Sequence, residues 1–307
     1  YDIQNRKMFE FSGKETIQSD IVKAIIDDGN GNIWIGTNSK GIYILNEQAD
    51  NLMHIHRDSG TPFSLSSNHI NSFYKDNQDI LWVGTTKQGV AFTDLNNTAF
   101  EICKTPEQED ISCFQEDRNG KLWLGFDGKG LACYDSKQIN YKLFNTHNSN
   151  IPSNLIIGSY LDSKGKMWFG SYGGGIFYEQ NGIFFPFKQT LESIEYVRHI
   201  ADDKYGNLWV GTFMHGLYCI DNGGKITSYT KENSCLYTNT ITDLVYSSDH
   251  AMLYIGTSTG LYELNTQTQQ LAPVKGNDNE VSLIKMHISC LYRDQRGLLW
   301  IGTRHGI

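Results

Sequence analysis

Residues 206–218 read Gly-Asn-Leu-Trp-Val-Gly-Thr-Phe-Met-His-Gly-Leu-Tyr, and the centre of this stretch, an aromatic residue two positions before a glycine, returns along the whole chain. All six tryptophans lie in such copies, and a tyrosine stands in the one copy that lacks tryptophan. The seven copies are centred on Trp34, Trp82, Trp123, Trp168, Trp209, Tyr254 and Trp300. A rare residue confined to one register indicates a structural repeat.

The spacing of the copies predicts the architecture. Consecutive aromatic anchors lie 41 to 48 residues apart. Repeats of roughly 40–50 residues with four short strands each are typical of β-propellers. Each repeat consists of short β-type runs broken by Gly, Asn and Asp, which argues against helical repeats of similar length. We predict an all-β fold, a seven-bladed β-propeller with four antiparallel strands per blade, in which residues 1–307 form a single domain.

The two ends of the chain complement each other. Residues 6–11 look like the outermost strand of a blade, whereas residues 288–307 supply an inner strand, the Trp300 strand and the start of a third. We expect the N- and C-terminal strands to share one blade and close the ring, because closure removes exposed sheet edges. The chain starts and stops inside the repeat pattern, so we interpret it as a fragment of a larger protein.

A turn with two recurring residues precedes each aromatic anchor. Aspartate at such a turn accepts hydrogen bonds from backbone N–H groups, and glycine adopts positive φ. An acid that recurs in six of the seven repeats is therefore interpreted as structural, and the tryptophans as core residues between blades. The acid six residues before the anchor is Asp28, Asp76, Asp117, Asp162, Asp203 or Asp294, with Ser248 in the sixth repeat. The glycine three residues before it is Gly31, Gly120, Gly165, Gly206 or Gly297, with Asp79 and Ala251 in the other two.

Charge, apolar runs and the spacing of cysteine and histidine argue against several classes of function. The chain has 26 basic and 34 acidic residues and a net charge of −8, which argues against nucleic-acid binding because that needs a basic face. No apolar run reaches the ~18 residues of a membrane span. The six cysteines form no Cys-x-x-Cys pair and the histidines have no metal-type spacing, so we expect neither a metal nor a cofactor. Cysteines share a register in pairs, Cys133 with Cys219 and Cys113 with Cys290, which favours buried apolar roles and leaves disulfides open.

The fullest copy of the repeat resembles a known family. Ser64-Leu65-Ser66-Ser67-Asn68 is followed by Asp76, by Leu81-Trp82-Val83-Gly84-Thr85 and by Gly89. This pattern is similar to the two-component regulator propeller repeat, and the resemblance covers essentially the whole chain. It implies the extracytoplasmic, periplasmic sensor region of a hybrid histidine kinase from Bacteroidetes. Such a region binds glycan fragments and regulates polysaccharide utilisation through a kinase elsewhere in the parent protein. The sixth repeat departs from the pattern at Ser248, Ala251 and Tyr254.

Three functions stay open, since propellers host all of them. The first is the sensor that the resemblance implies, with an oligosaccharide ligand and the rest of the kinase chain as partners. The second is a propeller enzyme, a lyase or glycoside hydrolase, and the third is a protein–protein or dimerisation scaffold. A hydrolase needs a pair of carboxylates, but the non-repeat acids Asp110, Asp127 and Asp243 lie in three different blades. We therefore expect no catalytic residues in this chain, and a homodimer is left open.

Residues that break the repeat predict the binding site. The loops between strands two and three and those between strands four and one share one face of a propeller, and most blades carry small residues there. Aromatic rings beside Arg, Asp and His suit a sugar, because the rings cover C–H surfaces and the polar groups bind hydroxyls. The alternative is that these rings pack on the loop of the next blade. The predicted ligand-binding residues are Phe126, Asp127, Tyr172, Tyr196, Arg198, Phe213, His215 and Arg304.

Overall fold

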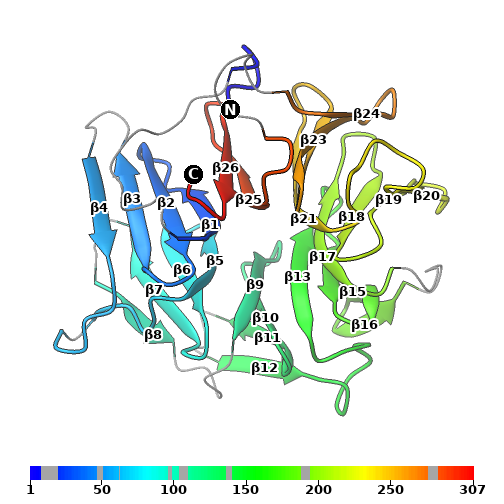
Figure 1. Cartoon of the computed structure of the whole chain (residues 1–307). Coiled ribbons are helices and arrows are strands. Elements are labelled where there is room, and N and C mark those ends of the chain that lie inside the picture. Colours follow the sequence, from blue (N-terminus) through cyan, green and yellow to red (C-terminus); the bar gives the residue numbers. More distant parts are fainter. Residues whose placement is uncertain are drawn as a thin grey trace. The chain divides into compact units, whose positions relative to one another are not determined.

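The fold is a seven-bladed β-propeller, seen here in a computed structural model (Figure 1). The structure describes residues 1–7, 20–46, 51–61, 63–95, 99–103, 110–135, 140–187, 194–275 and 283–307. These residues form strands and no helix. Six antiparallel sheets have four strands each, and a seventh has two. The prediction of an all-β, seven-bladed propeller is therefore confirmed.

The described residues group into two compact units, residues 1–114 with 289–307 and residues 115–288. Blade 1 contains β1 (Val22–Asp27), β2 (Asn32–Thr37), β3 (Ile42–Asn46) and β4 (Asn51–Ile55). Blade 2 contains β5 (Ile70–Lys75), β6 (Ile80–Thr85), β7 (Val90–Asp94) and β8 (Glu101–Cys103). Blade 7 contains β25 (Ile288–Arg293) and β26 (Leu299–Thr303).

The other unit is built in the same way from four blades. Blade 3 contains β9 (Ile111–Glu116), whose first residues belong to the first unit, β10 (Leu122–Phe126), β11 (Gly130–Asp135) and β12 (Asn140–Phe144). Blade 4 contains β13 (Ile156–Leu161), β14 (Met167–Ser171), β15 (Gly175–Gln180) and β16 (Ile183–Pro186). Blade 5 contains β17 (Val197–Asp202), β18 (Leu208–Thr212), β19 (Leu217–Ile220) and β20 (Ile226–Tyr229). Blade 6 contains β21 (Ile241–Ser247), β22 (Met252–Thr257), β23 (Gly260–Asn265) and β24 (Gln270–Pro273).

Both ends of the chain contribute to blade 7. The N–H of Leu299 donates to the carbonyl of Tyr1 over 2.8 Å, and the Tyr1 nitrogen donates back over 2.7 Å. Tyr1 thus pairs with Leu299 as Leu45 of β3 pairs with Ile33 of β2. The first residues take the place of a third strand, a detail that we had not predicted. Of the expected outermost strand over residues 6–11, residues 8–11 lie outside the described residues, and Lys7 pairs with Asp2.

The recurring aspartates have the structural role that was predicted, and each also binds its tryptophan. One carboxylate oxygen accepts the backbone N–H four residues later, as Asp203 does from Asn207 over 3.0 Å. The other oxygen accepts the indole N–H of the anchor in six blades, over 2.8 to 3.4 Å. Each acid therefore ties the turn to the buried ring, so a catalytic or metal role is not needed to explain it.

The position before the anchor strand requires positive φ in every blade. Its glycines have φ between +76° and +87°, and the two exceptions, Asp79 and Ala251, have φ of +61° and +52°. Left-handed backbone costs an L-residue about 1–2 kcal/mol, although aspartate tolerates it better than alanine. Ala251 therefore holds strained backbone in blade 6.

Exchanging Ala251 for glycine is expected to raise the free energy of unfolding by about 1 kcal/mol, because glycine adopts positive φ without strain. Urea denaturation of the purified domain measures the change. The reverse exchange, Gly31→Ala, is the matched control. A Cβ at Gly31 meets no atom within 4 Å, so any loss there reports backbone strain alone. Equal stabilities in both comparisons would contradict the strain at this position.

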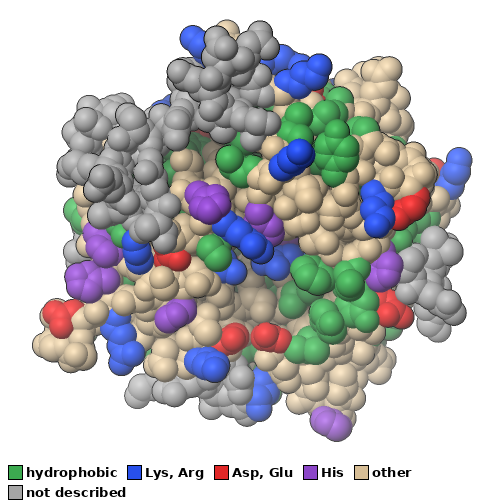
Figure 2. Space-filling model, in the orientation of Figure 1, with side chains coloured by type: hydrophobic (Ala, Val, Ile, Leu, Met, Phe, Trp, Pro, Cys, Tyr) green, Lys and Arg blue, Asp and Glu red, His purple; other side chains and the backbone are tan. Residues whose placement is uncertain are grey.

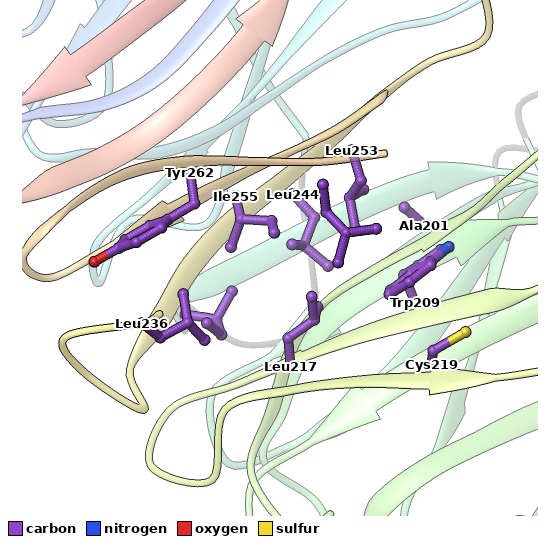
Figure 3. Close-up of a cluster of buried hydrophobic side chains, with 11 residues drawn as sticks. Ala201, Trp209, Leu217, Cys219, Leu236, Leu244, Leu253, Ile255 and Tyr262 are labelled. Atoms are coloured by element: carbon purple, nitrogen blue, oxygen red, sulfur yellow. The ribbon is translucent and has the colours of Figure 1, made fainter. Parts of the chain in front are cut away.

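The anchor side chains fill the spaces between neighbouring blades. Between blades 5 and 6, Trp209 packs with Leu217 and Cys219 of its own blade and with Leu253 and Ile255 of the next (Figure 3). Trp209 is fully buried, and Trp123 and Trp168 are also in the core. Burial, with Asp203 and Asp221 nearby, raises the pKa of the Cys219 thiol to about 12. This thiol is therefore protonated at neutral pH and acts as a small apolar residue, as predicted.

Candidate functional site

Backbone contacts join the loops of blades 3, 4 and 5 on one side of the second unit. Asp127 bridges to Leu155, whose carbonyl accepts the N–H of Tyr172 over 2.9 Å. Tyr172 in turn bridges to Tyr196, whose carbonyl accepts the N–H of Phe213 over 3.0 Å. The loops between strands two and three thus meet the entries to the next blade's first strand, as the propeller arrangement predicts.

Three aromatic rings contact one another along this run. The rings of Tyr172 and Tyr196 lie 4.5 Å apart between centroids, tilted by 54°. The Tyr196 ring stacks on the imidazole of His215 at 5.9 Å, with only 11° between their planes. The turn after β18 fixes His215, because its N–H donates to the Thr212 hydroxyl over 3.0 Å. Ring contacts between blades therefore hold these side chains in place.

The same loops carry exposed apolar side chains. Tyr172 is 50% exposed, Phe213 46% and Met214 59%. We call Tyr172, Tyr196, Phe213, Met214 and His215 the Tyr172 surface. Figure 2 shows a group of hydrophobic side chains over β13, β15 and β17. Large exposed apolar groups gathered on one face mark a binding site more often than single ones do.

The seam between blades 4 and 5 brings two backbones into direct contact below this surface. A Cβ added at Gly158 of β13 would lie 2.3 Å from the carbonyl oxygen of Arg198 in β17. The same seam is closed by the N–H groups of Gly173 and Gly175, which both donate to the carbonyl of Glu195. The strand that carries Tyr196 and Arg198 is therefore fixed against blade 4.

The structure corrects one predicted site residue. Phe126 ends β10 and is only 2% exposed, so its ring belongs to the core and cannot contact a ligand. The residues that occupy this position in other blades, such as Thr37 and Thr85, are equally buried. A threonine there uses its hydroxyl locally: Thr37 donates to the carbonyl of Gly41 over 2.9 Å. The position itself faces inward, whatever residue stands there.

The other predicted residues are distributed as follows. Tyr172, Tyr196, Phe213 and His215 come together in the Tyr172 surface. Asp127 and Arg198 are exposed in the same unit, Asp127 beside Leu155 and Arg198 two residues after Tyr196. Arg304 is exposed in the turn after β26, which belongs to the other unit.

A histidine–aspartate pair that the sequence analysis does not predict lies on the innermost strands of blades 5 and 6. His199 Nδ1 of β17 lies 2.9 Å from Asp243 Oδ1 of β21. The side chains are 28% and 13% exposed. The sequence held a signal for this pair, because both residues stand two positions after the start of the strand, where the other blades carry small residues.

No three His, Cys, Asp or Glu side chains among the described residues come together as a metal site would require. Within the same described ranges, no helix is long and apolar enough to span a bilayer.

Five of the repeats match a known family of propeller repeats. The family model described as two component regulator propeller matches residues 16–39, 64–87, 106–128, 192–214 and 282–305. These matches fall in five of the seven repeats that the anchors define. The chain therefore carries five copies of the two component regulator propeller repeat.

Relatives of this chain are much longer than the chain itself. Histidine kinase P4 of Formosa agariphila is 24% identical over 96% of this chain, which spans 26% of that protein. An extracellular domain assigned to a hybrid two component system of B. thetaiotaomicron has a TM-score of 0.79 at 23% identity. That match covers 94% of this chain and 38% of the other.

An enzyme has the same fold. Virginiamycin B lyase from Staphylococcus aureus has a TM-score of 0.74 at 13% identity, and the match covers 95% of this chain and 94% of that one. At this identity the likeness shows the fold alone.

Proposed function

We propose that this chain is the extracytoplasmic, periplasmic sensor domain of a larger two-component histidine kinase. In this proposal the domain binds oligosaccharide fragments at the Tyr172 surface and thereby regulates polysaccharide utilisation. The chain itself catalyses no reaction. The observation that carries the proposal is the pre-arranged cluster of the exposed Tyr172 ring with the half-buried rings of Tyr196 and His215.

The chemistry of this stack suits a sugar. Pyranose rings offer flat C–H surfaces to aromatic faces and hydroxyls to polar groups at the edge. Tyr172 provides a half-exposed ring, and Asp127 and Arg198 provide exposed polar groups in the same unit. Because the rings are held by backbone bridges before a ligand arrives, little side-chain ordering opposes binding.

The comparisons support the sensing part of the proposal. A histidine kinase of which this chain spans 26% is a relative, and a structural neighbour is an extracellular domain of a two component system. Binding to the propeller reaches a kinase only if the ligand favours one arrangement of the parent receptor over another. The kinase, the membrane attachment and any homodimer would be properties of that parent protein.

Calorimetry against plant, host and microbial oligosaccharides tests the proposal. We expect binding near micromolar, about −8 kcal/mol, for the best member of the panel. Tyr172→Ala should weaken it roughly two- to twelvefold, because an aromatic contact contributes about 0.5–1.5 kcal/mol. Tyr205→Ala is the matched control, since Tyr205 is 40% exposed but follows β17 instead of preceding it.

Two outcomes would contradict the proposal. If an oligosaccharide binds and the Tyr172→Ala and Phe213→Ala variants bind it equally well, the site lies elsewhere. If no panel member binds, the exposed Phe213 and Met214 favour the scaffold function instead. Turnover of a bound sugar by the purified domain would favour the enzyme.

A further inference from the structure

The innermost strands have one position at which blades 5 and 6 differ from the rest. It lies two residues after the start of each strand, next to a β-bulge, and it pairs with the glycine of the anchor motif in five blades. Blade 5 carries His199 here and blade 6 carries Asp243. The other five blades carry Ala24, Ser72, Cys113, Gly158 and Cys290.

The fold does not require a large or charged side chain at this position, since five blades form the same strand with small ones. Two neighbouring blades nevertheless place an imidazole and a carboxylate in contact, 2.9 Å apart. A partly buried hydrogen bond between two polar side chains adds little to stability, because both groups lose their hydrogen bonds to water when the protein folds. The presence of this pair therefore calls for a reason other than stability.

The contacts of the pair define its chemistry. Asp243 Oδ1 accepts the N–H of Leu244 over 2.7 Å and also faces His199 Nδ1. A carboxylate at Nδ1 holds the proton on that nitrogen, so the neutral ring keeps its lone pair on Nε2. Nε2 is covered and has no hydrogen-bond partner among the described residues. An imidazole acceptor oriented in this way is suited to a hydroxyl donor.

We propose that His199 and Asp243 form a polar subsite in which Nε2 of His199 accepts a hydrogen bond from a hydroxyl group of a polyhydroxylated ligand. In this proposal the ligand approaches the exposed edge of the pair, since 28% of the His199 side chain is open to solvent, and the ring rotates on binding to present the covered Nε2. The subsite shares β17 and its entry with Tyr196 of the Tyr172 surface. It extends the proposed function and rests on it for the identity of the ligand.

The first test needs no oligosaccharide. Nitrogen-15 NMR of the imidazoles should show the Nδ1–H form for His199, and a titration with glycerol and methyl glucoside should shift its Nε2 resonance. The His199→Ala variant assigns the signal. Asp243→Ser is the control, because it removes the carboxylate and should mix the two neutral forms. An Nε2–H form in the unaltered protein, or an Nε2 resonance that neither probe moves, overturns the subsite.

The second test exchanges the pair for residues that other blades carry. The His199→Ala/Asp243→Ser variant should keep or raise its midpoint of thermal unfolding, because Ala24 and Ser72 occupy this position in blades 1 and 2. Its affinity for the best oligosaccharide of the panel should fall about tenfold, or 1.4 kcal/mol. Cys290→Ala, at the same position in blade 7, should leave that affinity unchanged.

The outcomes separate this inference from the proposed function. A large loss of stability in the double variant, with unchanged affinity, makes the pair structural and overturns the subsite while the Tyr172 surface stands. Failure of every oligosaccharide to bind contradicts the proposed function, and the glycerol and methyl glucoside titration then decides the subsite by itself.

Discussion

Replacing Trp209 with alanine is expected to lower the free energy of unfolding by about 3–5 kcal/mol, the usual loss when a large buried ring leaves a cavity. Trp209 is fully buried in the core between blades 5 and 6. Its neighbours Leu217, Leu253 and Ile255 belong to strands held by backbone ladders, so they cannot close around the space. Urea denaturation followed by circular dichroism measures the change.

Trp300→Ala is the matched control for this prediction. Trp300 has the same place in blade 7 and binds its aspartate in the same way, over 3.0 Å, but it is only partly buried. Its loss should therefore be smaller than that of Trp209. Equal losses would mean that the hydrogen bond, and not the cavity, determines the cost. A Trp209→Ala variant of full stability that fails to bind a ligand would instead move this ring into a binding site.

The sequence predicts the fold well because the repeat averages over local ambiguity. Any single copy of the motif is a short β-type run, but seven copies in one register leave few alternatives to a propeller. The roles of the aspartates follow for the same reason, since an acid in six turns cannot be a unique catalytic group. The hydrogen bond between the aspartate and the indole could not be predicted, because it depends on how the turn folds back over the following strand.

The candidate site is less predictable, and Phe126 shows why. Phe126 differs in type from its counterparts in the other repeats, and the prediction treats it as exposed for that reason. Its position in the blade is nevertheless the same as theirs. Thr37, Thr85 and Thr212 are fully buried at that position, so a larger residue there enters the core. Tyr172 and Phe213 are exposed because they belong to loops, where the repeat leaves the side chain free to face solvent.

The His199–Asp243 pair is a candidate site that the sequence-based prediction did not include. Asp243 already stands out as a non-repeat acid, but only comparison of one position across the seven inner strands pairs it with His199. The same comparison separates both residues from Ala24, Ser72 and Gly158. That comparison could have been made from the sequence. The contact itself could not, because it joins two blades 44 residues apart in the chain through packing of β17 on β21.

Removing the carboxylate of Asp203 should be nearly as costly as removing Trp209. Asp203 is 3% exposed and accepts four hydrogen bonds. The donors are the backbone N–H groups of Tyr205 and Asn207, the side-chain amide of Asn207 and the indole of Trp209. Asp203→Ala leaves buried donors without an acceptor, at a cost of about 3 kcal/mol in the free energy of unfolding.

Blade 6 supplies the matched control, because it has neither partner. Ser248 stands at the acid's position and Tyr254, which has no indole N–H, stands at the anchor and is 2% exposed. The acid and the indole thus occur together in six blades, and both are missing from blade 6. The Asp203→Ser/Trp209→Tyr double variant reproduces that combination in blade 5. Its free energy of unfolding should exceed, by at least ~1 kcal/mol, the value expected from adding the losses of the Asp203→Ser and Trp209→Tyr single variants. The effects of two residues that share a hydrogen bond are not additive. Denaturation of the parent, both single variants and the double variant completes the cycle. Strict additivity would mean that the acid serves the turn alone and that its contact with the indole contributes nothing.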